Sequence, residues 1–458
     1  MGKRKERLMV LPRATAGRGF VAPRYSAKAR RFMIVVGGWY LRILEGVRNV
    51  EIADAELLID ELERFYNGEQ RLVIAFRHVA KEDAPVMMYA LNRKLQRMIR
   101  KRTRTRRKED RIIPHARFLY GSDVLDWAGK AAAWLFPKIG CVPVQNRGNN
   151  KNGLDILRRE MRDGTFPIAL APESQVTYHM YRCSPLAAGV ASLAVWGGSD
   201  DKEVTIIPVA IGYRHGDDPL QVIRNVMHRW EEQTGLHLEN PESRPPLELL
   251  LEATQLTVEL LEQLYAIDRK KDDGNLRDRI LHICEIAMRK AEMLALVEPQ
   301  GSLLDRLFRI RYSAVEAIHP HRFIPNQLPQ LGRSIADFHA LEAHVYARHS
   351  QLVDVLQYVD PSYIAAPCST GRACEYALSL LDVLNRVQGG NINTRYSPKG
   401  KKALVSVGSP VRVSEIGETA KGLSRKERLS KLSEAIFEAL QTTSEAMEPL
   451  WEPQVFDA

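Results

Sequence analysis

The sequence predicts an α/β fold, with a mixed, mostly parallel sheet flanked by helices and a large all-helical insertion. Three observations predict it. Between about 61 and 214, short apolar runs rich in β-branched residues alternate with helical patterns, as in successive βα units. From 215 to 399 the pattern changes to long amphipathic helices. Strand character returns at 401–413, and because a lone strand is not stable, we expect it to complete the earlier sheet.

These changes of pattern divide the 458 residues into four regions. Residues 1–60 form a basic N-terminal segment, in which the apolar run at 33–44 is either a helix lying in a membrane interface or an ordinary core helix. Residues 61–214 form the α/β domain, and 215–399 form the helical insertion. Residues 400–458 supply a last strand and a C-terminal helix that complete the α/β domain.

The expected elements of the α/β domain follow one another in a regular order. They are a strand at 71–76, a helix from Asp83 to about 99, a strand within 115–123, a helix at 127–136, a strand-like turn at 139–148, a helix at 152–164, a strand within 166–174, a helix at 184–196 and a strand at 203–214. The clearest helices of the insertion are expected at 247–267, 276–296, 334–359 and 371–387, and the C-terminal helix at 424–447.

The charge is strongly basic, because 66 Lys and Arg residues outnumber 56 Asp and Glu residues. The excess gathers at the amino end and at 93–111, so these stretches either bind a polyanion (nucleic acid or an anionic lipid surface) or form solvated faces. Five cysteines without C-x-x-C spacing indicate a reducing compartment and argue against a disulfide framework or a zinc site. We expect no membrane-spanning helix, because no apolar run reaches roughly eighteen residues, and no secretory signal, because no small-residue cleavage site follows an early apolar core.

The stretch RLVIAFRHVAKEDAP at 71–85 takes an apolar strand directly into polar residues. His78 follows the strand and Asp83 begins the next helix, at the kind of junction where α/β folds bind ligands. A strand-loop-helix corner can bring the two side chains together, so that Asp83 fixes the tautomer of His78 while His78 accepts a proton from a nucleophile. The alternative is that Asp83 only caps the helix and His78 is a polar residue at a strand end.

Three further blocks follow this His-x4-Asp motif in order: GCVPVQNRG with Arg147, LAPES with Glu173, and IIPVAI with Pro208. The four ordered blocks resemble the motifs of the phospholipid/glycerol acyltransferase family, the lysophosphatidate acyltransferase-like enzymes. A single His-x4-Asp is a weak signal, whereas four blocks in this order are much stronger. The resemblance covers about 60–214 and extends, through ALVSVGSPVRV, to 401–447, while the helical region has no counterpart in the family pattern.

The resemblance implies transfer of a fatty acyl group from an acyl-CoA or acyl-ACP thioester to a hydroxyl of a glycerol-phosphate-type acceptor, such as 1-acylglycerol 3-phosphate, in phospholipid biosynthesis. On this resemblance His78 is the general base and Asp83 orients it. Arg147 matches the arginine that grips the acceptor phosphate, and Glu173, with Ser174 beside it, positions the acceptor. Without a site, Arg147 is a surface residue of a polar turn and Glu173 a helix cap.

The third block departs from the family pattern. Where the family has Gly-Thr-Arg after the glutamate, this chain has Ser-Gln-Val at 174–176, so a second phosphate-facing arginine is missing. Either Arg182 or Lys151 replaces it, or the acceptor is not a simple glycerol phosphate. Arg77, directly before the histidine, either supplies another positive charge or only flanks the site.

The expected enzyme needs no cofactor and no metal, and His339, His344 and His349 are spaced so that they scatter around a helix. Its expected partners are the thioester donor, the lysophospholipid or glycerol phosphate acceptor, an anionic membrane surface and, as a further candidate, acyl carrier protein. It is expected in the cytoplasm, peripheral on the inner face of the membrane. Two alternatives stay open: a nucleic-acid-binding protein that uses the Arg-rich 97–111, and a catalytically inactive acyltransferase fold that binds a partner.

Overall fold

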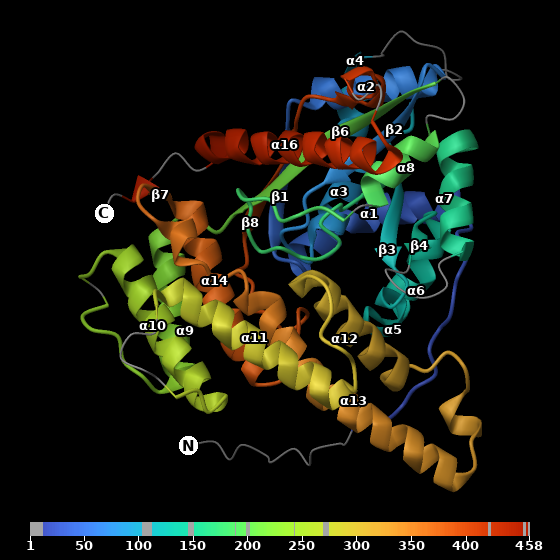
Figure 1. Ribbon diagram of the computed structural model, residues 1–458. Helices are drawn as coiled ribbons and strands as arrows, with labels where there is room; N and C mark the ends of the chain where they lie inside the picture. The colour runs from blue at the N-terminus through green and yellow to red at the C-terminus, as the bar shows by residue number, and fades with distance from the viewer. Residues whose placement is uncertain are drawn as a thin grey trace.

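The computed structural model of the protein describes residues 12–102, 112–144, 151–187, 189–197, 202–241, 243–268, 274–419, 423–451 and 455–456. Its centre is an eight-stranded sheet in the order β1-β8-β6-β2-β5-β3-β4, with β9 paired to β6 (Figure 1). The strands are β1 (Val47–Ala53), β2 (Gln70–Phe76), β3 (Arg117–Gly121), β4 (Val142–Val144), β5 (Ile168–Leu170), β6 (Glu203–Arg214), β8 (Lys401–Val407) and β9 (Val411–Arg412). The neighbours from β6 to β4 run parallel, whereas β8 is antiparallel to β6, which confirms the predicted mixed, mostly parallel sheet.

The strand expected at 401–413 does join this sheet, and it separates two strands that come much earlier in the chain. Val405 of β8 lies opposite Ile52 of β1 on one side and Ile211 of β6 on the other. The expected strand ends at Val407, and the short β9 follows it. No strand was expected at β1, inside the region 1–60; this edge strand has buried residues only at Val47 and Val50, so it lacks the continuous apolar run of a buried strand.

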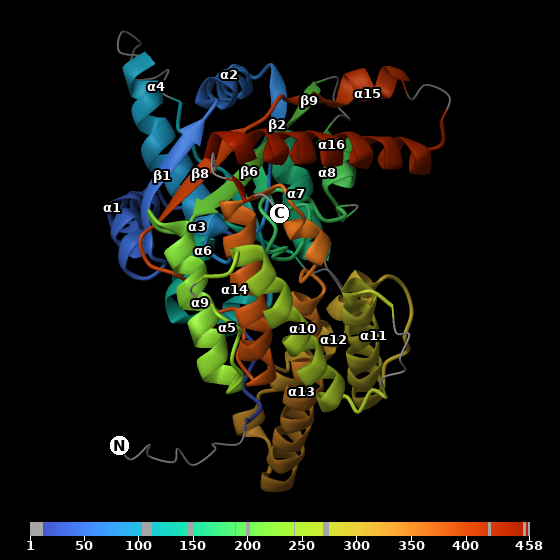
Figure 2. The same ribbon diagram turned by 90° about the vertical axis from the view of Figure 1, so that its left-hand side faces the viewer.

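The two faces of the sheet are covered by different helices (Figure 2). Leu72, Ile74 and Phe76 of β2 belong to a core shared with α1 (Ala27–Ile43), α2 (Ala55–Tyr66) and α3 (Asp83–Tyr89). Val73 and Ala75 belong to a second core shared with α7 (Lys151–Asp163), α8 (Gly189–Gly197) and α16 (Arg425–Trp451). Because successive strand residues point to opposite faces, a continuous apolar strand serves both cores.

Two expected helices differ in detail from the observed ones. The helix expected from Asp83 to about 99 contains a π-helical turn, Ala90–Leu95, before it continues as α4 (Gln96–Arg102). The helix expected at 184–196 begins only at Gly189, since the backbone before it bonds to other segments: the Ala187 amide donates to the carbonyl of Pro172 at 2.8 Å. The remaining helices of this part are α5 (Val124–Trp127), α6 (Gly129–Lys138) and α15 (Val413–Thr419).

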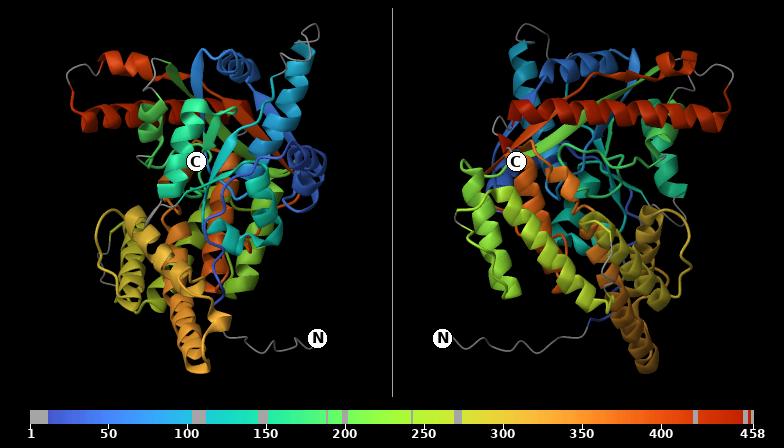
Figure 3. Two further views of the ribbon diagram at one scale, coloured as in Figure 1. Left: turned by 90° about the vertical axis from the view of Figure 1, so that its right-hand side faces the viewer. Right: turned by 60° about the vertical axis from the view of Figure 1, so that its left-hand side comes forward.

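Residues 215 to 399 are mostly helical, as expected, and these helices gather on one side of the sheet (Figure 3). They are α9 (Pro219–Thr234), α10 (Pro246–Leu264), α11 (Leu276–Ala295), α12 (Leu303–Ile318), α13 (Gln330–Leu356) and α14 (Thr370–Val387), with 3-10 turns at Pro325–Gln327 and Pro361–Ile364. The strands β7 (Cys368–Ser369) and β10 (Val455–Phe456) pair separately. In the described ranges, no helix is both long and apolar enough to cross a membrane.

The helical region has its own apolar core, which the loop after β5 enters. Trp230 is fully buried in this core, and so are most apolar residues of α10, α11 and α14. Val176 and Tyr178, which follow the third sequence block, belong to the same core. The segment beyond Glu173 therefore packs on the helical region. This loop, which follows β5 of the sheet, is thus held by contacts with both parts of the molecule.

The C-terminal helix α16 offers a matched test of its core contribution. Replacing Leu440, which is completely buried on the sheet, by Ala should lower the free energy of unfolding by about 2–5 kcal/mol, because the lost contacts leave a cavity. Leu450→Ala on the same helix removes the same atoms from an exposed side chain and should change it by less than about 0.5 kcal/mol. Urea unfolding measures both. Equal effects of the two substitutions would contradict the packing of α16 on the sheet.

Candidate active site

The corner between β2 and α3 brings His78 and Asp83 together. Nδ1 of His78 lies 3.0 Å from Oδ2 of Asp83, and the histidine side chain is 26% exposed whereas the aspartate is completely buried. Asp83 is the first residue of α3 rather than its cap, a position that Glu82 takes. The predicted spatial pairing of the two side chains is confirmed, and the contact leaves Nε2 of His78 as the nitrogen that can take up a proton.

Asp83 is held in place by two further hydrogen bonds. The Ala80 amide donates to Oδ2 at 2.8 Å, and the hydroxyl of Tyr213, near the end of β6, donates to Oδ1 at 2.5 Å. Burial, followed by the negative charge and hydrogen bond of Asp83, raises the pKa of Tyr213 well above its usual value, so its hydroxyl stays a donor. The carboxylate therefore cannot rotate away from the imidazole without breaking buried hydrogen bonds.

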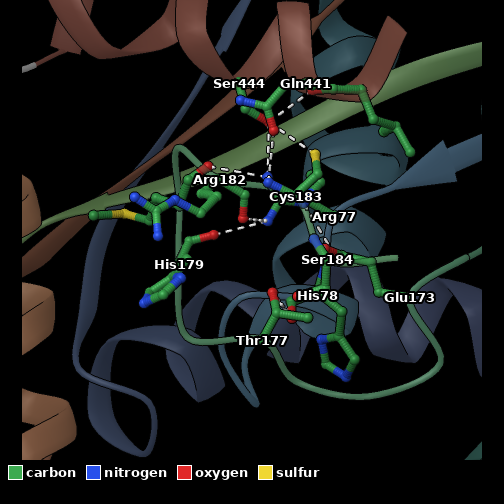
Figure 4. Close-up of polar contacts among 12 residues, drawn as sticks. Arg77, His78, Glu173, Thr177, His179, Arg182, Cys183, Ser184, Gln441 and Ser444 are labelled. Carbon is green, nitrogen blue, oxygen red and sulfur yellow. Dashed lines mark hydrogen bonds and ion pairs between the residues drawn. The ribbon is translucent and has the colours of Figure 1, made fainter. Parts of the chain in front are cut away.

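Arg77, the residue before His78, is fully buried, and its side chain points away from the imidazole of His78 (Figure 4). Its Nε donates to Oε2 of Glu173 at 3.0 Å. The remaining donors reach the main-chain carbonyls of residues 179, 180 and 182 and the hydroxyl of Ser444 on α16. All five N–H groups of the guanidinium thus have an acceptor. Two roles were considered for Arg77: another positive charge at the site, or a residue that only flanks it. The structure favours the second, because the guanidinium makes all of its hydrogen bonds to protein groups.

Glu173 is fully buried as well, and its three bonds are all made to the protein. Besides Arg77, its Oε2 accepts from the main-chain amide of His78 at 3.1 Å, and its Oε1 accepts from the amide of Ser184 at 2.9 Å. Glu173 therefore fixes the backbone of His78 by accepting a hydrogen bond from its amide. A direct contact with the acceptor, as the resemblance implies for this residue, stays a prediction.

The chain turns sharply after Glu173 and returns to the histidine. Ser174 adopts a left-handed backbone conformation with φ of 60°, which non-glycine residues rarely do, and its amide bonds to the carbonyl of Ala171. Three residues on, the Thr177 amide donates to the carbonyl of His78 at 2.8 Å. Both main-chain groups of His78 are thus bonded to the segment that carries the third block (Figure 4).

The next part of the loop is fastened to the helical region. Nε2 of Gln175 donates to the hydroxyl of Tyr358 at 2.7 Å, and His179 contacts the carbonyl of the same tyrosine at 2.8 Å. His179 also stacks on Tyr363, with ring centroids 4.0 Å apart. The end of α13 and the turn that follows it therefore form a wall beside the His78 corner.

A cavity of about 2080 Å³ opens at this corner and extends in two directions. Towards α1, α3 and α6 its lining is largely apolar and includes Met33, Val36, Met88, Leu135 and Phe136. Towards α12, α13 and the turn after α13 its lining is more polar and includes Arg182, Arg277, Arg311, Gln351 and Asp360. His78, Glu173 and Ser174 also line this cavity.

Of three further described residues singled out in the sequence, Pro208, Lys151 and Arg182, only Arg182 lines the cavity. Arg147 lies outside the described residues, so its contact with an acceptor phosphate stays a prediction. Pro208 pairs with Ala75 inside the sheet. Of the two candidates for the missing arginine, Arg182 lines the cavity, whereas Lys151 is exposed at the beginning of α7.

Two residues of the site were not found from the sequence. Tyr213 stands at the end of a predicted strand, and its place at the carboxyl edge of the sheet was the signal available. Tyr358 lies near the end of a predicted helix, 183 residues after Gln175, and no local pattern links the two residues. A buried carboxylate behind a half-exposed imidazole, beside a large cavity, is an arrangement that activates a hydroxyl nucleophile.

Comparison with known families agrees with this chemistry. Residues 50–212 match the model of the family described as Acyltransferase, so the chain contains a domain of that family. The matched segment runs from β1 to β6 and includes His78, Asp83 and Glu173. A search of curated proteins found no match.

The buried pair of Arg77 and Glu173 predicts a large loss of stability when one partner is neutralised. Glu173→Gln should lower the free energy of unfolding by about 3–5 kcal/mol, because a desolvated guanidinium is left without its counter-charge. The control is Glu69→Gln, which neutralises an exposed partner of Arg64 and should cost less than about 1 kcal/mol. A Glu173→Gln variant as stable as wild type in urea unfolding would contradict the structural role of this pair.

Proposed function

Because residues 50–212 form a domain of the acyltransferase family, we propose that the protein is an O-acyltransferase acting on a glycerol-phosphate-type acceptor such as 1-acylglycerol 3-phosphate. The donor is a fatty acyl thioester of coenzyme A or acyl carrier protein, and the reaction belongs to phospholipid biosynthesis. The observation that carries the proposal is the imidazole of His78, held by the buried Asp83 and lining a large cavity whose wall near α1, α3 and α6 is mostly apolar.

The proposed reaction is a direct transfer. Nε2 of His78 takes the proton of the acceptor hydroxyl while the oxygen attacks the thioester carbonyl carbon, so that a C–O bond forms and the C–S bond breaks. Asp83 stabilises the imidazolium, which returns the proton to the leaving thiolate. The products are an ester and a free thiol, and the chain's own residues perform each proton transfer.

The shape of the cavity supports a fatty acyl substrate. Its apolar end passes between α1, α3 and α6, where side chains such as Met88 and Phe136 can cover an alkyl chain. Burying each methylene stabilises the bound state by about 0.8 kcal/mol, which is enough for a long chain to dominate binding. The nucleic-acid alternative depends on residues 97–111, most of which lie outside the described residues, and it leaves this cavity unexplained.

The exposed side of α1 supports a peripheral position on the inner, cytoplasmic face of an anionic membrane. Phe32, Val35, Trp39 and Ile43 are exposed, and their spacing of three or four residues places them along one side of the helix. Exposed basic residues accompany them: Lys28, Arg31 and Arg42. Of the two interpretations given to the run at 33–44, this arrangement favours a helix in the interface, because an apolar side with basic flanks suits a lipid surface.

His78→Ala should abolish acyl transfer, measured as thiol release from a long-chain acyl-CoA or acyl carrier protein in the presence of 1-acylglycerol 3-phosphate. The general base contributes about 10²- to 10⁴-fold, so the remaining rate should fall by at least that factor. The matched control is His228→Ala, since His228 is exposed on α9 and should not affect the rate. Equal activity of the His78 variant and wild type would contradict the mechanism. Absence of thiol release by wild type with each donor and acceptor would favour the inactive, partner-binding alternative.

The double substitution Val35→Asp/Trp39→Asp should reduce partitioning onto anionic phosphatidylglycerol vesicles by at least about tenfold, because it places two charges on the apolar side of α1. Vesicle co-sedimentation measures this. The control is Leu264→Asp/Leu450→Asp, which makes the same chemical change at exposed leucines of α10 and α16. Unchanged partitioning of the α1 variant would show that this helix does not contact the membrane.

A further inference from the structure

The arginine that the third block lacks has a candidate replacement on the same loop. The backbone of Arg182 is fixed to the site, because its carbonyl accepts from Nη2 of the buried Arg77 at 2.8 Å. Its side chain is 42% exposed, lines the cavity and passes over the ring of Tyr363 at 5.2 Å. Arg182 thus presents a cationic group to the cavity from a backbone that is rigidly connected to His78.

A second arginine reaches the same place from the helical region. Arg182 donates to Oδ2 of Asp360 at 2.8 Å, and Nε of Arg277 on α11 lies 4.0 Å from the same oxygen. Burial by itself raises the pKa of Asp360. The hydrogen bonds from Ser362 and the charges of Arg277 and Arg182 lower this pKa by a larger amount, so the net shift is downward and the carboxylate is ionised. Two guanidinium groups therefore share the carboxylate of Asp360, and Nη1 of Arg277 also donates to the main-chain carbonyls of Gln357 and Val359 at 3.0 and 3.1 Å.

The same wall contains polar atoms that the described residues do not satisfy. Oε1 of Gln175 and Nε2 of Gln357 are buried without a hydrogen-bond partner among the described residues, and both side chains line the cavity. Gln175 is 8% exposed and is held by its other amide atom at the hydroxyl of Tyr358. Buried polar groups normally have partners, so these two amides mark the part of the wall near Tyr358 as polar.

We propose that Arg182 and Arg277 bind the anionic headgroup of the acceptor, in place of the arginine missing from the third block. This inference rests on the proposed function and adds to it that the helical region supplies part of the acceptor site. A phosphate group can take the place of the Asp360 carboxylate at the guanidinium of Arg182, because a guanidinium group binds either anion through two parallel hydrogen bonds. The acyl chain then lies towards α1, and the headgroup lies towards the turn after α13.

Steady-state kinetics on the full-length protein with two acceptors tests this assignment. Arg182→Gln should raise KM for 1-acylglycerol 3-phosphate by about tenfold or more, because a charge-assisted contact is lost, while KM for the acyl donor stays unchanged. With the uncharged monoacylglycerol as acceptor, the same variant should behave like wild type, and Arg182→Lys should restore part of the loss. The matched control is Arg244→Gln, which removes an arginine paired with Glu248 at the start of α10 and should change neither KM.

A second variant should act in the opposite direction. Asp360→Asn removes the carboxylate that competes for the two arginines and keeps a side-chain oxygen that can still accept from the amide of Ser362. KM for 1-acylglycerol 3-phosphate should therefore fall, and inorganic phosphate should inhibit this variant at a lower concentration than wild type. If the Arg182–Asp360 pair were purely structural, both substitutions would raise KM for 1-acylglycerol 3-phosphate. A rise of this KM in both variants would therefore overturn the assignment.

The two levels of the hypothesis fail in different ways. If wild type transfers acyl groups to 1-acylglycerol 3-phosphate but Arg182→Gln leaves its KM unchanged, the headgroup site is wrong and the proposed function stands. If wild type transfers only to uncharged acceptors, the anionic headgroup is wrong and the acyltransferase stands. If wild type transfers to no acceptor, the proposed function itself fails.

Discussion

The buried ion pair between Arg77 and Glu173 is the constraint on which the rest of the site depends. Removing two charges from water costs several kcal/mol for each ion, and the attraction between them compensates for this only if the other hydrogen bonds are also made. Here they are: the guanidinium uses every donor, and the carboxylate accepts from the amides of His78 and Ser184 as well. The pair therefore joins the end of β2, the loop after β5 and α16 in one arrangement.

This arrangement explains how a histidine on a loop can be positioned for chemistry. The amide of His78 is bonded to Glu173 and its carbonyl to Thr177, and its ring is bonded to the carboxylate of Asp83, which Tyr213 and Ala80 hold. A catalytic group needs a fixed position within a fraction of an ångström, and such precision comes from supporting hydrogen bonds rather than from the side chain itself. The helical region contributes to the same support, because its core includes the loop that continues from Glu173.

Local features of the site could be predicted from the sequence, whereas long-range ones could not. The His78–Asp83 pairing depends on one strand end and one helix start five residues apart, and the motif contains both. The role of Arg77 depends on acceptors at 179–182 and at Ser444, which no neighbouring residue indicates. The same holds for the fold: the apolar strands were evident, but the half-exposed β1 became recognisable only through its pairing with β8, some 350 residues later.

On the proposed function, the helical region takes part in binding the acceptor. A cavity that ends in apolar side chains beneath α1 and in shared arginines beside Asp360 treats the two ends of an amphipathic molecule differently. On the proposed function, a lysolipid acceptor lies with its tail towards α1 and its headgroup towards the turn after α13. Gln175 and His179 tie that turn to the loop after Glu173, and the same loop is bonded to the backbone of His78 through Thr177. On the proposed assignment, acceptor recognition and positioning of the base share one set of hydrogen bonds.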